Sequence, residues 1–251
     1  MTDKIYNEDC LEGMKRIPDG VVDFVLTDLP FGTTNCRFDK RIDLEKFWEQ
    51  IKRVTKHNAA IALFAQMPFA VDLVNANRKM FRYEWIWKKT TAAGFFNANK
   101  MPLRCHEQIL IFYRALPTYN PQKEKAQPYK RKHKDYNGGI YRPLARIETI
   151  NEGDRYPLDV IFFNTITIYN RNIQRQHPMQ KPTELLEYLI KTYTNEGELV
   201  LDATIGSGST TVAAINTGRH FIGFETEKKF YDIANERIAK AYEEKAMRLM
   251  E

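Results

Sequence analysis

The stretch Leu199-Val200-Leu201-Asp202-Ala203-Thr204-Ile205-Gly206-Ser207-Gly208-Ser209-Thr210 runs from apolar residues through an acid into a glycine-rich loop. Its apolar beginning is typical of a strand that is buried on both faces of a parallel sheet. The two glycines let a ligand approach the backbone closely, at the point where a helix begins. The stretch therefore predicts a strand, a binding loop and a helix in succession.

The same alternation of apolar runs and amphipathic segments recurs along the chain. Further buried strands are expected over residues 21–27, 59–65, 109–113 and 221–224. Helices are expected after N-caps at Asp43 and Thr183, over residues 210–217 with a stop at Gly218, and from about residue 227. Along one face, the last helix is expected to bury Phe230, Ile233, Ala234, Ile238 and Tyr242. This order predicts an α/β fold with a doubly wound, mainly parallel sheet.

Positive charge is concentrated in one segment that interrupts this alternation. The 251 residues carry 38 Lys and Arg against 32 Asp and Glu, and residues 114–146 hold nine of these cations but only two of the acids. Tyrosines, prolines and glycines lie between the cations, which is typical of an irregular segment that contacts nucleic acid. A surface loop kept soluble by lysines is the alternative interpretation. Phosphate contacts are expected from Lys123, Lys125, Lys130, Arg131, Lys132 and Lys134.

Composition argues against membrane, exported and metal-binding proteins. Hydrophobic residues make up 43% of the chain, and no apolar run approaches the roughly 20 residues that span a bilayer. The polar start, residues 1–4, differs from a secretory signal, so a cytoplasmic location is expected. The three cysteines, Cys10, Cys36 and Cys105, lack the CxxC spacing of a zinc site. We therefore expect free thiols and no bound metal.

A cofactor can be predicted from the charges beside the glycine-rich loop. Glu225 follows the next strand, about 20 residues past the glycines, where an acid can bond ribose hydroxyls. Thr211 stands where a dinucleotide-binding loop has its third glycine, and the Asp202 carboxylate would repel a pyrophosphate. S-adenosylmethionine is cationic at its ammonium and sulfonium groups, so it suits a loop flanked by Asp202 and Asp28 better than NAD does.

A second loop, Val25-Leu26-Thr27-Asp28-Leu29-Pro30-Phe31-Gly32, follows another predicted strand. Pro30 holds Leu29 extended, so the Leu29 carbonyl and the Asp28 carboxylate can converge on the two hydrogens of an exocyclic amine. Phe31 offers a face on which a base can stack. The alternative is an ordinary strand end with Phe31 in the core. Residues 33–39 form either a lid over this site or a simple connector.

Both loops resemble motifs of the amino-group DNA methyltransferases. Asp28-Leu29-Pro30-Phe31 resembles the D-P-P-Y motif, and residues 202–211 resemble the D-P-F-x-G-S-G-T-T loop. The catalytic motif comes first and the cofactor loop last, as in the permuted beta-group of the family. Shorter matches are Asn7-Glu8-Asp9-Cys10 to the G-D-C segment, Trp85 to Lys89 with His106-Glu107 to W-x-K and H-E, and His177 to Thr183 to H-P-x-Q-K-P.

The resemblance implies a role for individual residues and regions. Residues 1–113 and 177–251 would form the catalytic and cofactor-binding domain, and residues 114–176 the target-recognition region. The catalytic residues would be Asp28, Leu29, Pro30 and Phe31. The cofactor would be bound by Asp9, Cys10, Asp28, Lys181, Asp202, Ala203, Thr204, Gly206, Ser207, Gly208, Ser209, Thr210 and Glu225. Leu29, Phe31 and Thr204 depart from the family pattern, which has proline, tyrosine and an aromatic there.

The function implied by the resemblance is site-specific methylation of the N6 amine of an adenine flipped out of duplex DNA, as in restriction-modification systems. An acid at position 28 favours adenine, since the family's cytosine-N4 enzymes often carry serine there. Cytosine-N4 methylation is the nearer alternative, and RNA is an alternative substrate. A non-catalytic DNA-binding protein on a decayed methyltransferase fold would also account for Leu29 and Thr204. A homodimer is the expected assembly, since family members often dimerise.

Overall fold

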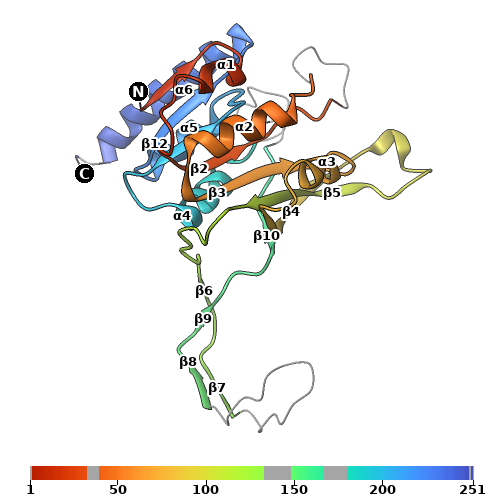
Figure 1. Cartoon of the computed structure of the whole chain (residues 1–251). Coiled ribbons are helices and arrows are strands. Elements are labelled where there is room, and N and C mark those ends of the chain that lie inside the picture. Colours follow the sequence, from red (N-terminus) through yellow and green to blue (C-terminus); the bar gives the residue numbers. More distant parts are fainter. Residues whose placement is uncertain (1, 33–39, 133–147, 167–179, 249, 251) are drawn as a thin grey trace. The chain divides into compact units, whose positions relative to one another are not determined.

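The computed structural model describes residues 2–32, 40–132, 148–166, 180–248 and 250 (Figure 1). It consists of two compact units, which we call the main unit, Met1–Asn120 with Asp159–Glu251, and the small unit, Pro121–Leu158. The lid segment at 33–39, Lys134 and the first three residues of the His177 motif lie outside the described residues. Within the described residues, no helix is long and apolar enough to cross a membrane.

The main unit is built on an eight-stranded sheet with the order β1-β12-β11-β2-β3-β5-β4-β10. These strands are β1 (Lys4–Tyr6), β2 (Val22–Thr27), β3 (Thr55–Ala65), β4 (Phe81–Ala93), β5 (Arg104–Phe112), β10 (Val160–Phe162), β11 (Leu199–Asp202) and β12 (His220–Phe224). Only β5 runs antiparallel to its neighbours, β3 and β4. The other seven strands run in one direction, so their carboxyl ends share one edge of the sheet.

Helices cover both faces of the sheet, as a doubly wound fold requires (Figure 1). One face packs against α1 (Cys10–Met14), α2 (Leu44–Val54) and α3 (Phe69–Ala76). The other packs against α4 (Thr183–Tyr193), α5 (Ser209–Asn216) and α6 (Lys228–Arg248). Successive residues of β3 alternate between the two cores, with Ile61 and Leu63 on the first face and Ala62 and Phe64 on the second. The predicted doubly wound, mainly parallel α/β class is confirmed.

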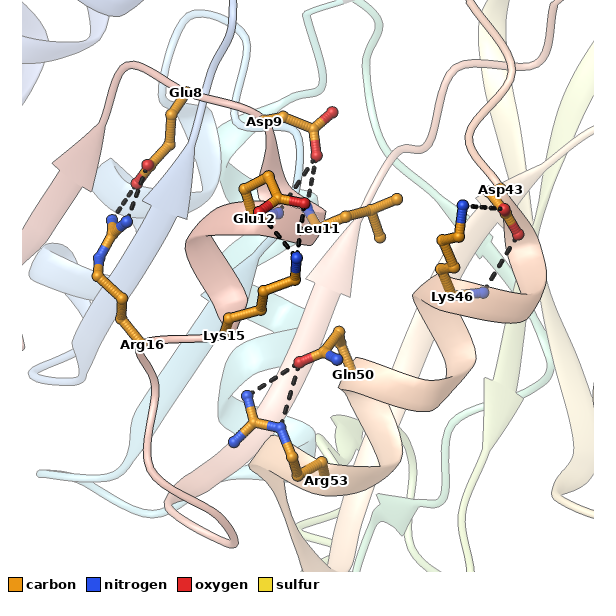
Figure 2. A network of polar contacts seen from close by, with 10 residues as sticks. All are labelled: Glu8, Asp9, Leu11, Glu12, Lys15, Arg16, Asp43, Lys46, Gln50 and Arg53. Atoms are coloured by element: carbon orange, nitrogen blue, oxygen red, sulfur yellow. Dashed lines mark hydrogen bonds and ion pairs between the residues drawn. The ribbon is translucent and has the colours of Figure 1, made fainter.

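Most of the predicted helix features are present, with two exceptions. Asp43 caps α2 by accepting hydrogen bonds from the backbone N–H groups of Glu45 and Lys46, and Figure 2 shows its contacts with Lys46. The Thr183 cap is wrong, because the extended Pro182 occupies the N-cap position and Thr183 is the first helical residue. Gly218 adopts the left-handed φ of 72° just past α5, as expected of a helix stop.

The prediction that Tyr242 is buried is also wrong, since this side chain is 43% exposed. The buried line of α6 runs through Phe230, Ala234 and Ala241 instead. Adjacent helical residues point about 100° apart, so a line that passes through Ala241 turns Tyr242 outward. Small alanines at these positions let α6 lie close to its neighbours.

The small unit contains two short antiparallel ladders. Strands β6 (Glu124–Lys125) and β9 (Asp154–Arg155) form one, and β7 (Tyr129–Lys132) and β8 (Glu148–Asn151) form the other. All four strands lie within residues 114–176, which the sequence analysis assigns to the target-recognition region. Strands β6 and β7 belong to the basic segment 114–146, which we expected to be irregular, and they pair with β9 and β8, which follow that segment in the chain.

We expect Gly208→Ala to destabilise the main unit more than a matched glycine substitution does. Gly208 has φ 77°, and a Cβ there would lie 2.9 Å from the Cβ of Ala234 on α6. Gly197 has a similar φ of 79° but open space around it. In urea unfolding, Gly197→Ala should lose about 1–2 kcal/mol from backbone strain. Gly208→Ala should lose about 1–3 kcal/mol more, because the helices must also separate. Equal losses would contradict this packing role.

Candidate active site

A cavity of about 660 Å³ opens at the edge where the parallel strands end, and the loops after β2, β11 and β12 line it. All of the predicted catalytic and cofactor-binding residues except Gly208 contribute to its wall. Gly208 lies instead at the N-cap of α5, against α6. Loops that are 174 residues apart in the chain therefore meet here because β2 and β11 are neighbours in the sheet.

Asp202, the last residue of β11, is a buried carboxylate that faces this cavity. Its Oδ1 accepts a hydrogen bond of 3.0 Å from the backbone N–H of Thr204. Burial raises the pKa of Asp202 to about 6, although hydrogen bonds from Thr210, Thr204 and Thr27 act in the opposite direction. Because burial disfavours the ionised form of Asp202, a cationic group bound next to it would stabilise that form.

Two other predicted cofactor-binding acids already hold the backbone of the cavity wall. Glu225 accepts hydrogen bonds from the N–H groups of Gly206, at 3.0 Å, and Glu227, at 2.8 Å, and burial raises its pKa. Asp9 caps α1 by accepting a 2.8 Å hydrogen bond from the N–H of Leu11 (Figure 2). These contacts fix where each carboxylate stands beside the cavity.

Thr204 links the two loops. Its hydroxyl donates to the backbone carbonyl of Asp28 at 3.0 Å and lies 2.9 Å from the hydroxyl of Thr27. The aromatic residue of the family pattern has no hydroxyl placed to make this bond. The departure at position 204 therefore has a local role, since it ties the loop after β11 to the loop after β2.

Asp28 belongs to a cluster of four charged side chains, of which Lys181 and Glu107 are buried. Lys181 contacts the Asp28 carboxylate at 2.5 Å and the Glu107 carboxylate at 3.3 Å, and Lys89 forms an ion pair with the other oxygen of Glu107. The Lys181 ammonium also lies over the ring of Phe64, 4.9 Å from its centre. Two positive and two negative charges balance here, which is what makes their burial affordable.

The members of the cluster shift one another's pKa. Burial raises the pKa of Asp28, and the Lys181 ammonium opposes that shift without cancelling it. Burial alone would also raise the pKa of Glu107, but Lys181 and Lys89 outweigh it and the pKa is lowered. Burial acts to lower the pKa of Lys181, yet Asp28 and Glu107 raise it to about 12. The lysine therefore stays protonated and favours the ionised form of both acids.

The second oxygen of Asp28 is the unusual atom of the site. Lys181 contacts Oδ2, whereas the buried Oδ1 has no hydrogen-bond partner among the described residues. A buried oxygen without a donor costs free energy, so its position suits a donor that arrives with a ligand. Leu29 is buried beside it, and Phe31 is half-buried against Phe69 with ring centres 5.1 Å apart. The predicted contacts of the Leu29 carbonyl and the Phe31 ring with a base stay predictions.

Arg237 on α6 is a residue of the site that the sequence analysis missed. Its guanidinium donates to the carbonyl of Ser207 at 2.7 Å and to the hydroxyls of Ser207 and Ser209 at 3.0 and 3.1 Å. Burial lowers its pKa to about 10. Arg237 thus fixes the glycine-rich loop through hydrogen bonds that come from α6. One arginine on an amphipathic helix gives no sequence signal of such a role.

Known proteins share both the sequence pattern and the fold of this chain. A family model described as DNA methylase, of the N6/N4 type, matches residues 22–236. The chain belongs to the DNA methylase family. The Type II methyltransferase M.BglII of Bacillus subtilis is 30% identical over 257 residues, which cover 92% of this chain and 67% of that protein. M.HpaI of Haemophilus parainfluenzae, also a Type II methyltransferase, is 25% identical over 252 residues, with 95% and 74% covered.

Solved structures of methylases show the same fold at lower identity. The complex of M1.HpyAVI with S-adenosylmethionine superimposes with a TM-score of 0.63 and 22% identity, covering 94% of this chain and 98% of that one. The cytosine-N4-specific PvuII DNA methyltransferase gives a TM-score of 0.65 and 15% identity, with 94% and 92% covered. The predicted methylase family, its fold and its cofactor S-adenosylmethionine are thereby confirmed.

We expect the affinity for S-adenosylmethionine to fall as the pH drops below about 6. The raised pKa of Asp202 means that its carboxyl is protonated there in the free protein, and a cationic ligand must then displace that proton. Titration calorimetry between pH 5 and 8 should show a loss of up to about tenfold per pH unit below the pKa.

Two variants test whether the titration of Asp202, rather than that of another group, causes this pH dependence. Asp202→Asn should weaken binding at pH 7.5 and flatten the profile, because its amide does not titrate. Asp43→Asn changes another acid of the cavity wall, one whose pKa is lowered by its hydrogen bonds to Lys46, and should keep the profile. An unchanged profile in Asp202→Asn would contradict the assignment.

Proposed function

We propose that this chain methylates the N6 amine of adenine in duplex DNA at a specific site. The observation that carries the proposal is the buried Oδ1 of Asp28, a residue of the cavity wall, which has no hydrogen-bond partner in the part of the chain that the structure describes. An exocyclic amine would supply the donor that this oxygen lacks. The Leu29 carbonyl would accept the second N–H of the same amine, which withdraws the nitrogen lone pair from conjugation with the ring.

The cavity has the chemical character that S-adenosylmethionine requires. Its wall combines the buried acid Asp202, the acid Glu225 beside the glycine-rich loop, and apolar side chains such as Phe224 and Phe230. Asp202 would attract a cationic group, and Glu225 would accept from ribose hydroxyls. S-adenosylmethionine supplies an electrophilic methyl group when it is bound. The chain then has to align the amine with it, and alignment can contribute on the order of 7–11 kcal/mol.

Lys181 and Phe31 would complete the mechanism. The Lys181 ammonium fixes one oxygen of Asp28, so the free oxygen keeps a single direction toward the amine. Phe31 would stack on the base after it leaves the duplex, and base stacking on an aromatic ring contributes about 1–3 kcal/mol. When the amine has gained the methyl group it must lose a proton, and the Asp28 carboxylate that holds the amine would be placed to accept it.

Adenine is preferred over cytosine because the first motif residue is an acid, as in most adenine enzymes that the motif resembles. Cytosine-N4 methylation is the second candidate, because the cytosine-N4-specific PvuII enzyme shares this fold with a TM-score of 0.65. Both bases present an exocyclic amine to Asp28. Sequencing that detects modified bases, applied to DNA from cells that express the chain, separates the two and gives the target site.

We further propose that the small unit contacts the DNA backbone. Lys130, Arg131 and Lys132 are exposed along β7. Lys123 and Lys125 are differently placed, because both pair with Asp154 at 3.7 and 2.6 Å. The exposed cations of β7 are therefore better placed to neutralise phosphates than the two lysines that share an acid.

Asp28→Asn should abolish methyl transfer and spare DNA binding. The amide keeps the shape of the side chain but loses the charge, and we expect the rate to fall at least about 100-fold. Transfer of a radiolabelled methyl group to DNA measures this, and a gel-shift assay measures binding. Asp232→Asn changes an exposed acid on α6 and should keep full activity. Normal methylation by Asp28→Asn would refute the proposed mechanism.

Removal of the β7 cations should lower the salt dependence of DNA binding. Each neutralised phosphate contributes a slope of about 0.9 in the plot of log affinity against log salt. The variant Lys130→Gln/Arg131→Gln/Lys132→Gln should therefore reduce the slope by about 2–3. The control Lys52→Gln/Lys229→Gln/Lys240→Gln removes the same charge from exposed helix positions of the main unit. Equal slopes for the two variants would show that β7 merely carries solvated charge.

A further inference from the structure

The loop between β4 and β5 places large apolar side chains in solvent. Phe96 is 103% exposed, Phe95 70% and Met101 55%. Gly94, with φ 95°, starts the short 3-10 turn that carries the two phenylalanines. Three exposed apolar side chains within eight residues contribute nothing to the core of the main unit, and such groupings mark contact surfaces.

This loop lies at the edge of the sheet that holds the cavity. Strand β4 runs parallel to β2, because both are linked through β3 and the antiparallel β5. Lys89 of β4 belongs to the charged cluster that includes Asp28, and the strand continues beyond it to Ala93. The four further residues of the strand, at ~3.3 Å each, place the start of the tip roughly 13 Å past the cluster. Figure 1 shows the β4–β5 hairpin, in yellow, extending from the sheet.

Charge identifies the partner that this tip fits. Residues 85–106 contain no Asp or Glu. Lys88, Lys100 and Arg104 are exposed cations on the same hairpin. Apolar tips flanked by cations suit a partner with an anionic surface and a stacked apolar interior, and duplex DNA combines the two. A second copy of this chain would bring the same positive charges into mutual repulsion.

We propose that the β4–β5 tip, residues 94–103, is a wedge that enters duplex DNA beside the target base. Phe96 inserts into the base stack, with Phe95 beside it, while the exposed cations hold the flanking phosphates. The wedge fills the space that the extruded base leaves, and so offsets part of the unstacking cost. This inference rests on the proposed function, since it assumes that the chain acts on a flipped base.

The test compares two duplexes that carry the target site found by sequencing. In one duplex the target base is paired, and in the other the opposite nucleotide is abasic, so that extrusion costs less. The variant Phe95→Ser/Phe96→Ser should methylate the paired duplex about tenfold more slowly, because the target base must then leave the stack without the wedge. On the abasic duplex its rate should return to within about twofold of the wild-type rate. The single variant Phe96→Leu, which keeps an apolar side chain at the tip, should retain most of the wild-type activity on the paired duplex.

Controls keep the outcome specific to the tip. Met247→Ala removes an exposed apolar side chain of α6 and should leave both rates unchanged. Affinity for S-adenosylmethionine and the melting temperature should match the wild type in every variant, because Phe95 and Phe96 are exposed.

Three results would overturn the wedge, and they are distinguishable. Equal loss on both duplexes would make the tip an ordinary DNA contact, and full activity of the double variant beside an active wild type would remove its role altogether. A dimer that becomes monomeric in the double variant, seen by sedimentation velocity, would make the tip a contact between two copies. If the wild type itself transferred no methyl group, the proposed function would fail first.

Discussion

The ammonium group of Lys181 is the interaction on which the arrangement of the site depends. It is almost fully buried, and it lies between the buried carboxylate of Glu107 and the carboxylate of Asp28, whose side chain is 21% exposed. A buried charge is tolerated only when it is paired, so each of these groups requires the others. Lys181 comes from the turn before α4, Glu107 from β5 and Asp28 from the loop after β2. One balanced cluster therefore fixes three separate parts of the chain at the carboxyl edge of the sheet, and it leaves Oδ1 of Asp28 without a hydrogen-bond partner among the described residues.

The sequence predicts those parts of the fold that depend on short-range periodicity. Strands β2, β11 and β12 are continuous apolar runs because both of their faces are covered by helices, and such runs are visible in the sequence. The acids that follow β2 and β11 could be assigned to one site for the same reason, since parallel neighbours end at a common edge. The meeting of Asp28 and Asp202 at the cavity is thus a consequence of strand order, which the order of the family motifs implies.

Features that depend on long-range contacts could not be predicted. Strand β4 lies near the end of the sheet with an irregular burial pattern, so its residues give no continuous apolar run. The pairing of Lys123 and Lys125 with Asp154 joins positions about 30 residues apart, and no local pattern distinguishes these lysines from those of β7. Arg237 reaches the glycine-rich loop from a neighbouring helix. In each case the decisive contact lies between elements, whereas periodicity describes only single elements.

Two of the three departures from the family motifs, Leu29 and Thr204, bear on whether the site has decayed. An eroded position would be expected to leave a void or an unsatisfied group, because selection no longer maintains its contacts. Leu29 instead lies fully buried in the core that includes α1, α2 and α3. The Thr204 hydroxyl makes two hydrogen bonds, one of them to the backbone carbonyl of Asp28. Both residues are thus integrated into well-packed surroundings, and the Thr204 bond joins the loop after β11 to the loop after β2. This arrangement argues for a maintained site, because the geometry of methyl transfer depends on these two loops keeping a fixed distance.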